Sequence, residues 1–353
     1  QVLFGISPPN DVAASFWSDA VFFIMGSLML AVAIVHQGLD TRLALGIIRF
    51  TGHQTWKIIF GFIAVCAILS SFIGEHTVTA MMMPVGLTLI RHTNKDPKKV
   101  AGLTGLILFS IAYGSAMGSI GTPSGGGRNV IMIGYLSQFG IADISYLEWM
   151  KYSYPVLLLE IPLAAVILWW TFRPEKMILD SAVRKLTVQV AKSGKMTGRQ
   201  IFAIAIFILV FLGWVFLSPR IGLGIVALIG VVLYLSFGLV EWRELNRNTN
   251  WAVILLFGAA ISIGFQMKET GAALWVATKM LDSLSLITPD VDKLRGITSV
   301  VLAAGLTNLL SNAATVAVIG PIVLNMGGDP VVIGIATAGA SSFAYLTVVA
   351  SPS

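Results

Sequence analysis

Residues 70–77 (SSFIGEHT) place a carboxylate, an imidazole and several hydroxyls in the middle of a long apolar run. The run extends from residue 58 to residue 90 and is otherwise almost free of charge. Groups of this kind are costly at membrane depth, so they usually line a binding site or a water-filled path. The stretch therefore predicts a polar site inside a membrane-embedded part of the chain.

A second apolar run, over residues 297–324, is interrupted in a similar way by residues 307–313 (TNLLSNA). The two interruptions lie in different halves of the chain. Together they predict a repeated membrane protein whose two halves meet at a substrate.

The composition agrees with a membrane location. Of the 353 residues, 56% are hydrophobic and only 11% are charged, whereas about 25% are charged in an average soluble domain. The mean hydropathy of +0.85 therefore predicts an integral protein with several spans. No cleavable signal peptide is expected, because the first ten residues lack a basic n-region, and both ends of the chain look truncated.

The charge and cysteine content narrow the possible functions. The net charge of +6 arises from basic residues in short loops, which is typical of membrane topology control and not of nucleic-acid binding. The single cysteine, Cys66, excludes an intrachain disulfide framework and a cysteine-based metal site. We find no zinc-site spacing and no phosphate-binding loop of the Gly-Lys-Ser/Thr type.

Two pairs of apolar segments are too short to form ordinary spans, which need about 20 residues. The pairs are 57–73 with 77–91, and 296–310 with 313–326. Each pair is split by a polar tip, and non-helical backbone at membrane depth is allowed where it lines a cavity. We therefore predict two re-entrant helical hairpins.

The loop charges predict the side from which each hairpin enters. Basic residues flank both ends of the first hairpin and fill the loop over residues 173–199, which places all three on the cytoplasmic side. The flanks of the second hairpin are mainly acidic, so it is expected to enter from the opposite side.

Each hairpin is followed by a segment that breaks at Gly, Ser and Pro, at residues 118–128 and 341–353. The predicted fold class is an all-α polytopic membrane protein built as an inverted-topology repeat, with two re-entrant hairpins and two broken helices. The predicted regions are a first repeat over 1–150 (hairpin about 57–91, broken helix about 101–139), connecting scaffold helices over 151–248, and a second repeat over 249–353 (hairpin about 296–326, truncated broken helix about 331–353).

The first tip offers groups for an ion or an anion. Glu75, His76 and Thr77 lie where a helix N-terminus favours an anion, while freed carbonyls and a carboxylate favour Na⁺ or H⁺. The open alternative is a buried ion pair of Glu75 with His76 or Arg128 that only holds helices together. At the second tip, Ser311 and Asn312 can donate hydrogen bonds to a carboxylate or a sulfate, or orient carbonyls around a cation.

The first broken segment is the third candidate. Its glycines and proline cannot sustain a helix and would expose backbone N–H groups as an anion nest. Arg128 follows them, and its guanidinium can clamp an oxyanion through two hydrogen bonds. Pairing with Glu75 remains the competing interpretation.

These segments resemble the divalent anion/sodium symporter (DASS) family of the ion transporter superfamily. Residues 311–315 (SNAAT) resemble its Ser-Asn-Thr hairpin motif, residues 121–129 (GTPSGGGRN) resemble its Gly-Thr-Pro-x-Gly-Thr-Pro-Pro-Asn loop, and residues 350–353 (ASPS) resemble the start of the second such loop. The resemblance implies a homodimer in the cell (inner) membrane, with a scaffold and an elevator-like transport part. It further implies a small, divalent anion such as a dicarboxylate or sulfate, with Na⁺ as the coupling ion and no other cofactor.

The resemblance also implies site residues. The first sodium site would comprise Ser70, Glu75 and Gly125, and the second would comprise Thr307, Asn312 and Ala350. The predicted substrate-binding residues are Glu75, His76, Thr77, Gly126, Arg128, Asn129, Ser311, Asn312, Ala313, Ser351 and Pro352.

The chain departs from the family pattern at the first tip. Gly74-Glu75-His76 replaces the first Ser-Asn-Thr, and Gly127-Arg128 stands where two prolines are expected. A buried Glu75 can carry a proton, or its pair with Arg128 can replace a missing cation. By the resemblance, the predicted function is a Na⁺-coupled secondary anion transporter, and the protein is not expected to be an enzyme. The alternatives are an H⁺-coupled or uncoupled anion exchanger and, from another class, an intramembrane enzyme that uses Glu75 and His76.

Overall fold

Every regular element in the described part of this computed structural model is a helix, as the sequence predicts. The described residues are 1–38, 51–94, 96–180, 183–185, 188, 195–285 and 291–343. The α-helices are α1 (Pro9–Ser15), α2 (Asp19–His36), α4 (Thr55–Ile73), α5 (Glu75–Thr93), α6 (Ala101–Gly118), α7 (Gly127–Gln138), α8 (Tyr146–Thr171), α10 (Gly198–Phe216), α11 (Ser218–Ile221), α12 (Leu223–Ser236), α13 (Trp242–Asn248), α14 (Trp251–Glu269), α15 (Ala272–Ser285), α16 (Val291–Leu306), α17 (Asn312–Leu324) and α18 (Pro330–Ala340). Short 3₁₀ helices are η1 (Val2–Phe4), η2 (Pro97–Val100) and η3 (Pro123–Gly125).

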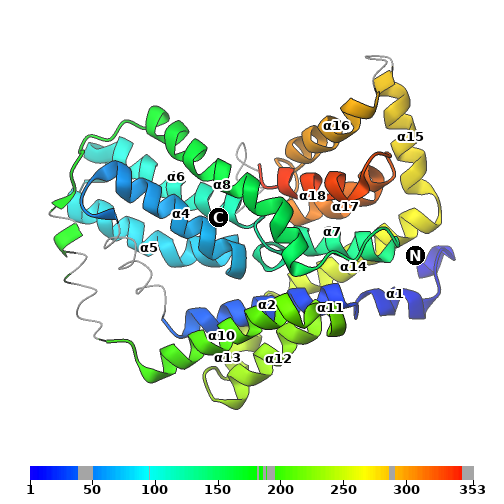
Figure 1. The fold of residues 1–353 in the computed structure, drawn as a ribbon, viewed down its shortest axis with the longest axis horizontal. Coiled ribbons are helices and arrows are strands. Elements are labelled where there is room, and N and C mark those ends of the chain that lie inside the picture. The colour runs from blue at the N-terminus through cyan, green and yellow to red at the C-terminus, as the bar shows by residue number, and fades with distance from the viewer. Residues whose placement is uncertain are drawn as a thin grey trace.

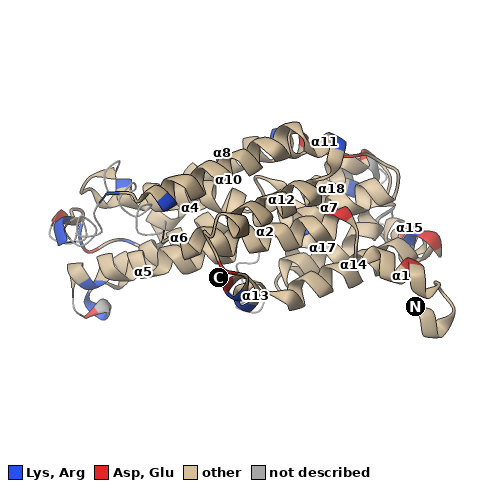
Figure 2. Cartoon of the chain, turned by 90° about the horizontal axis from the view of Figure 1, so that it is seen from below, with Lys and Arg blue, Asp and Glu red and all other residues tan. Residues whose placement is uncertain are grey.

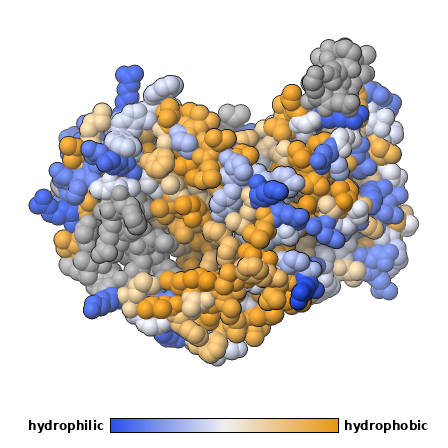
Figure 3. All heavy atoms as spheres, in the orientation of Figure 1, coloured by the Kyte–Doolittle hydropathy of each residue, from blue (hydrophilic) through white to orange (hydrophobic). Residues whose placement is uncertain are grey.

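Six helices in this part of the chain are long and apolar enough to cross a bilayer. Many large apolar side chains on α8 and α10 face outward, among them Leu159, Trp170 and Phe216. Figure 3 shows a largely apolar surface over the helices at the bottom of the molecule, where α10 and α12 lie. Because lipid is the solvent that accepts such a surface, the predicted polytopic membrane protein is confirmed.

The charged side chains gather mostly towards the two ends of the molecule, as Figure 2 shows. Lys and Arg are concentrated at the end where α5 terminates, while the middle of the helices is almost free of charge. This distribution fits helices that run from one membrane face to the other.

One glycine makes the sharp turn in the first helix pair. Gly74 alone joins α4 to α5, with φ 85° and ψ 152°, a conformation that residues with a Cβ avoid. Both helices pack against α6, which ends at Gly118. The chain then passes through η3 and resumes as α7 at Gly127, so the segment predicted to break does so between these two glycines.

The second helix pair repeats this plan. The helices α16 and α17 are joined by residues 307–311, and both pack against α18. Glu75 begins α5 and Asn312 begins α17, and each helix contains a proline nine residues later, at Pro84 and Pro321. The two helix pairs therefore share the arrangement of their connection, proline and packing partner.

The two helix pairs lie at opposite ends of the molecule, with their connections directed towards the middle (Figure 1). Helix α7 starts there and packs along α14, α17 and α18. One apolar core unites α4, α5, α6 and α8, and another unites α2, α7, α10, α12 and α14. The first turn of α7 therefore lies between the two tips.

Candidate functional site

The two tips touch through a hydrogen bond between residues 237 positions apart in the sequence. The Asn312 side-chain amide donates from Nδ2 to Glu75 Oε1 over 3.1 Å. Both residues are buried, and each is the first residue of its helix. This contact joins the starts of α5 and α17.

The other carboxylate oxygen of Glu75 faces the broken segment. Its Oε2 accepts a hydrogen bond from the Ser119 hydroxyl at 3.0 Å and lies 3.5 Å from Arg128 Nη1. Arg128 Nη2 contacts the same hydroxyl and the Ala116 carbonyl. The Arg128 side chain is only 2% exposed, and a buried cation requires such a counter-charge.

Glu75, Ser119, Arg128 and Asn312 form a polar cluster, and three helix N-termini converge on it. Glu75, Arg128 and Asn312 lie in the first turns of α5, α7 and α17, and they contact one another as described above. Each N-terminus carries a partial positive charge of about half a unit and free N–H groups. The cluster is therefore a place that favours negative charge in an apolar part of the chain.

Carbonyl oxygens gather on one side of the cluster, at the C-terminal ends of α4 and α6. A Cβ on Gly125 would lie 2.5 Å from the Ser119 carbonyl oxygen, 2.8 Å from that of Ser71 and 3.0 Å from that of Ser70. The Ser71 hydroxyl contacts the Gly118 carbonyl at 2.8 Å and so holds the two helix ends together. Carbonyls at helix C-termini are the groups that coordinate Na⁺ in broken-helix transporters. The three carbonyls here also accept hydrogen bonds from Gly74 N, Thr122 and Asn129.

The C-terminal ends of α16 and α18 form the equivalent arrangement. The Thr307 hydroxyl contacts the Ser341 carbonyl at 2.6 Å and the Asn312 side-chain oxygen at 2.9 Å. Asn308 donates to the Phe343 carbonyl at 3.3 Å. The Thr307 hydroxyl and these carbonyl oxygens therefore gather beside the start of α17.

Buried polar side chains hold the broken segment in place. Asn129 Nδ2 donates to the carbonyls of Ser119 and Thr122, both at 2.8 Å. The Thr122 hydroxyl donates to the Ser71 carbonyl and contacts the Tyr146 hydroxyl. Asn129 therefore ties the loop together instead of pointing into the cluster.

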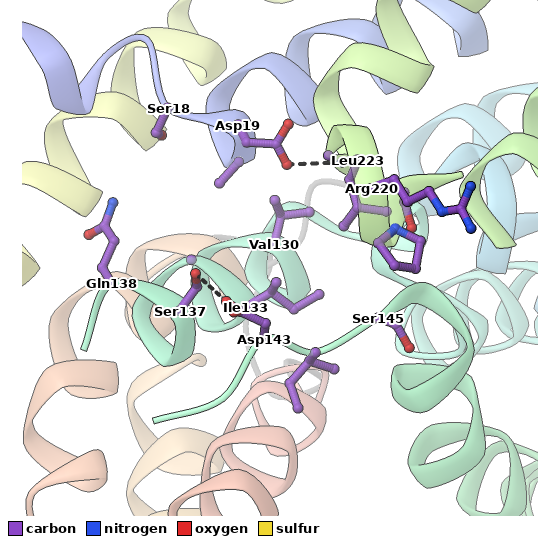
Figure 4. A pocket seen from close by; sticks show the side chains of 16 residues that line it. Ser18, Asp19, Val130, Ile133, Ser137, Gln138, Asp143, Ser145, Arg220 and Leu223 are labelled. Carbon is purple, nitrogen blue, oxygen red and sulfur yellow. Dashed lines mark hydrogen bonds between the residues drawn. The ribbon is translucent and has the colours of Figure 1, made fainter. Parts of the chain in front are cut away.

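A cavity of about 470 Å³ lies elsewhere, between α2, α7, α11 and the start of α12. Figure 4 shows Asp19 directed towards the N-terminus of α12, where it accepts hydrogen bonds from Leu223 N and Gly224 N. Ser137 contacts Asp143 at 2.6 Å on the opposite wall. Since none of the predicted site residues lines this cavity, the chemistry of the tips, and not cavity size, marks the candidate site.

Comparison with known proteins identifies the family. The family described as "Sodium:sulfate symporter transmembrane region" matches residues 6–353. The chain belongs to the sodium:sulfate symporter family. It is 28% identical to the sodium-dependent high-affinity dicarboxylate transporter 3 of Caenorhabditis elegans, over 99% of this chain and 70% of the relative. It is 27% and 26% identical to the sodium-dependent dicarboxylate transporters SdcS of Staphylococcus saprophyticus and Staphylococcus aureus, over 98% of this chain and 71% of each relative.

Membership of the sodium:sulfate symporter family confirms several predictions from sequence. The family assignment, the class of secondary anion transporter and the multi-pass membrane location are confirmed. The prediction that the chain is not an enzyme is also confirmed, because the family and these relatives are transporters. The intramembrane enzyme is thereby set aside.

The structure brings part of the predicted symporter site together. Glu75, Arg128 and Asn312 touch, and Gly126 lies beside the guanidinium of Arg128. His76 Nε2 lies 3.7 Å from Glu75 Oε1, and its side chain is 63% exposed. The ion pair left open as an alternative is thus present within the cluster.

Other predicted residues of the symporter site lie differently. Ser311 is exposed, and its hydroxyl caps α17 by accepting from Ala314 N. Ala313 packs against the apolar core around α7, and Thr77 is half-buried. The remaining predicted ligands, Ala350, Ser351 and Pro352, lie outside the described residues.

Sequence reasoning missed Ser119, which contacts both charges of the cluster and supplies a carbonyl beside Gly125. A signal was present in the sequence pattern. Ser119 follows α6 and Ser341 follows α18, so each serine comes directly after a helix that packs against one of the two helix pairs.

Proposed function

We propose that this member of the sodium:sulfate symporter family is a secondary active transporter that moves a small organic or inorganic anion together with Na⁺. The relatives named as sodium-dependent dicarboxylate transporters support Na⁺ coupling and make dicarboxylates and sulfate the first anions to test. The observation that carries the proposal is the contact between Asn312 and Glu75, which brings two helix N-termini together beside the buried Arg128.

The proposed anion site is the region that these N-termini face. His76 is its exposed member, and Arg128, Asn312 and Gly126 are the groups beside it. The proposed sodium sites are the oxygen sets of Ser70, Glu75 and Gly125, and of Thr307, Asn312 and Ala350. Both sets contain side-chain oxygens, and the first set also lies beside helix C-terminal carbonyls, which suits a hard cation.

We further propose that access to the two membrane faces alternates by an elevator movement. The part that bears the hairpins, α4 with α5 and α16 with α17, would move against a scaffold that includes α10 and α12. The hairpins would be re-entrant from opposite membrane faces, and the protein would work as a homodimer in the cell (inner) membrane. The helix pairs at opposite ends of the molecule support this proposal (Figure 1).

A second candidate is an anion exchanger that needs no sodium at the first site. The observation that favours it is the ion pair between Glu75 and Arg128, in which a protein cation already neutralises the carboxylate. In this candidate H⁺ or no ion replaces Na⁺ in the transport cycle.

Uptake by proteoliposomes tests both candidates. Purified protein is reconstituted, and uptake of radiolabelled succinate or sulfate is measured with Na⁺ and pH gradients imposed separately. The proposal predicts saturable uptake that an inward Na⁺ gradient stimulates. Uptake that responds only to internal anion, or only to the pH gradient, would instead establish the exchanger, and absence of saturable uptake for every anion would contradict the transport function.

A matched pair of asparagine variants tests the site. Asn312→Ala removes the contact between the tips, so we expect uptake to fall at least about tenfold, as for the loss of a hydrogen bond to a charged group. Asn325→Ala removes an asparagine at the other end of the same helix, where its side chain donates to the Pro321 carbonyl. Uptake by this control should remain close to that of the wild type.

A further inference from the structure

The contacts of Arg128 with the cluster leave part of its guanidinium unsatisfied. The Nη1 and Nη2 atoms contact Glu75, Ser119 and the Ala116 carbonyl. The Nε atom is buried and has no hydrogen-bond partner in the part of the chain that the structure describes. Since a guanidinium carries five N–H donors in a fixed fork, Arg128 has the capacity for a partner in addition to Glu75.

A second carboxylate lies in the same region, on α8. Glu160 is in the apolar middle of this helix, one turn after Leu157. A Cβ on Gly121 in the broken segment would lie 3.1 Å from Leu157 Cδ2, and residues three apart on a helix share a face. Among the described residues, Glu160 Oε2 is buried without a hydrogen-bond partner, and Arg128 is the charged group with which Glu160 interacts.

Glu160 changes the charge balance of the cluster. Glu75 and Arg128 cancel each other, and an ionised Glu160 adds one further negative charge. His76 also lies near Glu75, but its side chain is 63% exposed, so water screens whatever charge it carries. The buried groups without Na⁺ therefore carry one net negative charge.

The proposed sodium site at Glu75 needs this additional charge. A Na⁺ ion at Glu75 would share the carboxylate with Arg128, whose Nη1 lies 3.5 Å from Oε2. Two cations on one buried carboxylate repel each other strongly. With an ionised Glu160 the same groups form two neutral pairs, Na⁺ with Glu75 and Arg128 with Glu160.

We infer that Glu160 is the counter-charge that allows Na⁺ and Arg128 to stand on either side of Glu75 at the same time. Glu160 is a positioning residue in this role, because it acts on the ion through Arg128 and is a ligand of neither the ion nor the anion. It also keeps the cluster negative until Na⁺ binds, so a divalent anion is repelled from the cluster without Na⁺ and accepted by the cluster with Na⁺. This inference rests on the proposed function, whose sodium site at Glu75 and divalent anion it uses.

The melting temperature of the purified protein in detergent measures Na⁺ binding, because an ion that binds only the folded state stabilises it. NaCl is titrated against choline chloride at constant ionic strength and about pH 8.5, well above the ordinary pKa of a glutamate side chain. The Na⁺ concentration that gives half of the maximal stabilisation is then compared between variants. The second proposed sodium site, at Thr307, is common to all of them, so a change reports the first site.

We expect Glu160→Gln to raise this Na⁺ concentration roughly tenfold, the size expected for one unit charge at about 10 Å and an effective dielectric constant of about 20. Glu160→Asp keeps the charge and should stay close to the wild type. Glu160→Ala makes the same charge change as Glu160→Gln and serves where that variant does not fold.

Two further variants test the charge argument. Glu160→Gln combined with Arg128→Gln removes both members of the second pair, so the half-maximal Na⁺ concentration should return towards that of the wild type. Glu241→Gln removes an exposed carboxylate just before α13 and should leave it unchanged.

The outcomes separate the inference from the proposed function. A half-maximal Na⁺ concentration that is the same in wild type and Glu160→Gln overturns the inference and leaves anion transport standing, even where Glu160→Gln slows the uptake of succinate by proteoliposomes. Failure of Na⁺ to stabilise the wild type more than choline overturns the sodium coupling of the proposed function, and the inference with it.

Discussion

Arg128 shows how one charged residue is kept at the centre of an apolar chain. Its guanidinium is almost fully buried, yet it contacts the Glu75 carboxylate, the Ser119 hydroxyl and the Ala116 carbonyl. Burial of an ion is compensated only where its partners are close and numerous. The pair with Glu75 is therefore a structural requirement of the tips as well as a feature of the proposed site.

The prediction at this scale concerns the pair. Arg128→Gln leaves Glu75 as an uncompensated buried charge, so we expect the free energy of unfolding to fall by about 3–5 kcal/mol. Arg128→Gln combined with Glu75→Gln should be less destabilised than Arg128→Gln alone. Chemical unfolding in detergent measures both, and a double variant that is the less stable of the two would contradict the pairing.

Tyr135 connects two elements through one hydroxyl. The oxygen lies 2.9 Å from the Ala317 carbonyl on α17 and 2.9 Å from the Ala260 carbonyl on α14. Pro321 has no N–H for the carbonyl four residues before it, so the Tyr135 hydroxyl supplies the hydrogen bond that the helix lacks at Ala317. The ring fits beside Gly264 and Gly320, where a Cβ would lie within 3 Å of its atoms.

Tyr135→Phe tests this element contact. We expect a loss of about 1–3 kcal/mol in unfolding free energy, because the Ala317 carbonyl is left buried without a donor. Tyr234→Phe is the matched control. Its hydroxyl donates to Ala203 inside α10, where the helix itself also supplies a donor, so the loss should be smaller. Equal losses of unfolding free energy in the two variants would show that the missing N–H of Pro321 does not account for the effect of Tyr135→Phe.

Glu175 connects the chain after α8 to the start of α6. Its carboxylate accepts from Gly102 N at 2.8 Å and from Leu103 N at 3.1 Å. Burial alone would raise the pKa of Glu175, but the backbone N–H groups of Gly102, Leu103 and Glu175 itself outweigh it and lower the pKa below its ordinary value of 4.5. The charged form thus stabilises the folded state.

A pH dependence follows from this direction. A carboxyl group whose pKa is lowered by folding stabilises the protein fully when the pH is above its pKa in the unfolded state. This stabilisation is lost as the pH falls through its pKa in the folded state. We expect the melting temperature of the wild type to decrease more than that of Glu175→Gln as the pH falls below about 4.5. Parallel curves for the two proteins in thermal unfolding scans would exclude this contribution.

At the scale of the whole molecule, the proposed topology requires both ends of the first hairpin on one membrane face. Lys57 and Arg91 are exposed near the outer ends of α4 and α5. Cys66→Ser removes the buried single cysteine, so cysteines introduced at residues 57 and 91 can be labelled separately with a membrane-impermeant thiol reagent. We expect labelling of both from the cytoplasmic side.

A third position provides the control. A cysteine in place of Arg220, in the short helix α11, which lies away from the outer ends of α4 and α5 in Figure 1, should be labelled from the opposite side. If residues 57 and 91 were labelled from opposite sides, α4 and α5 would each cross the bilayer, and the proposal of two opposed re-entrant hairpins would fail.

The class of protein, the helical elements and the three polar segments can be read from the amino-acid sequence alone. Apolar runs with few charges permit only membrane helices, and Gly74 and Pro123 mark where those helices must stop or turn. These are local properties of the sequence, so they do not depend on how the rest of the chain packs. The family motif around Asn312 is likewise a continuous stretch of sequence, so it can be recognised without the tertiary structure.

Which polar groups meet depends on how the helices pack in three dimensions. Glu75 and Asn312 are 237 residues apart, and no local pattern records that their helices start at one point. The sequence left open whether Arg128 pairs with Glu75, and it gave no prominence to Ser119, which bonds to both. A buried charge is satisfied by whatever the packing of α6, α7 and α17 brings within reach, and packing is a property of the whole fold.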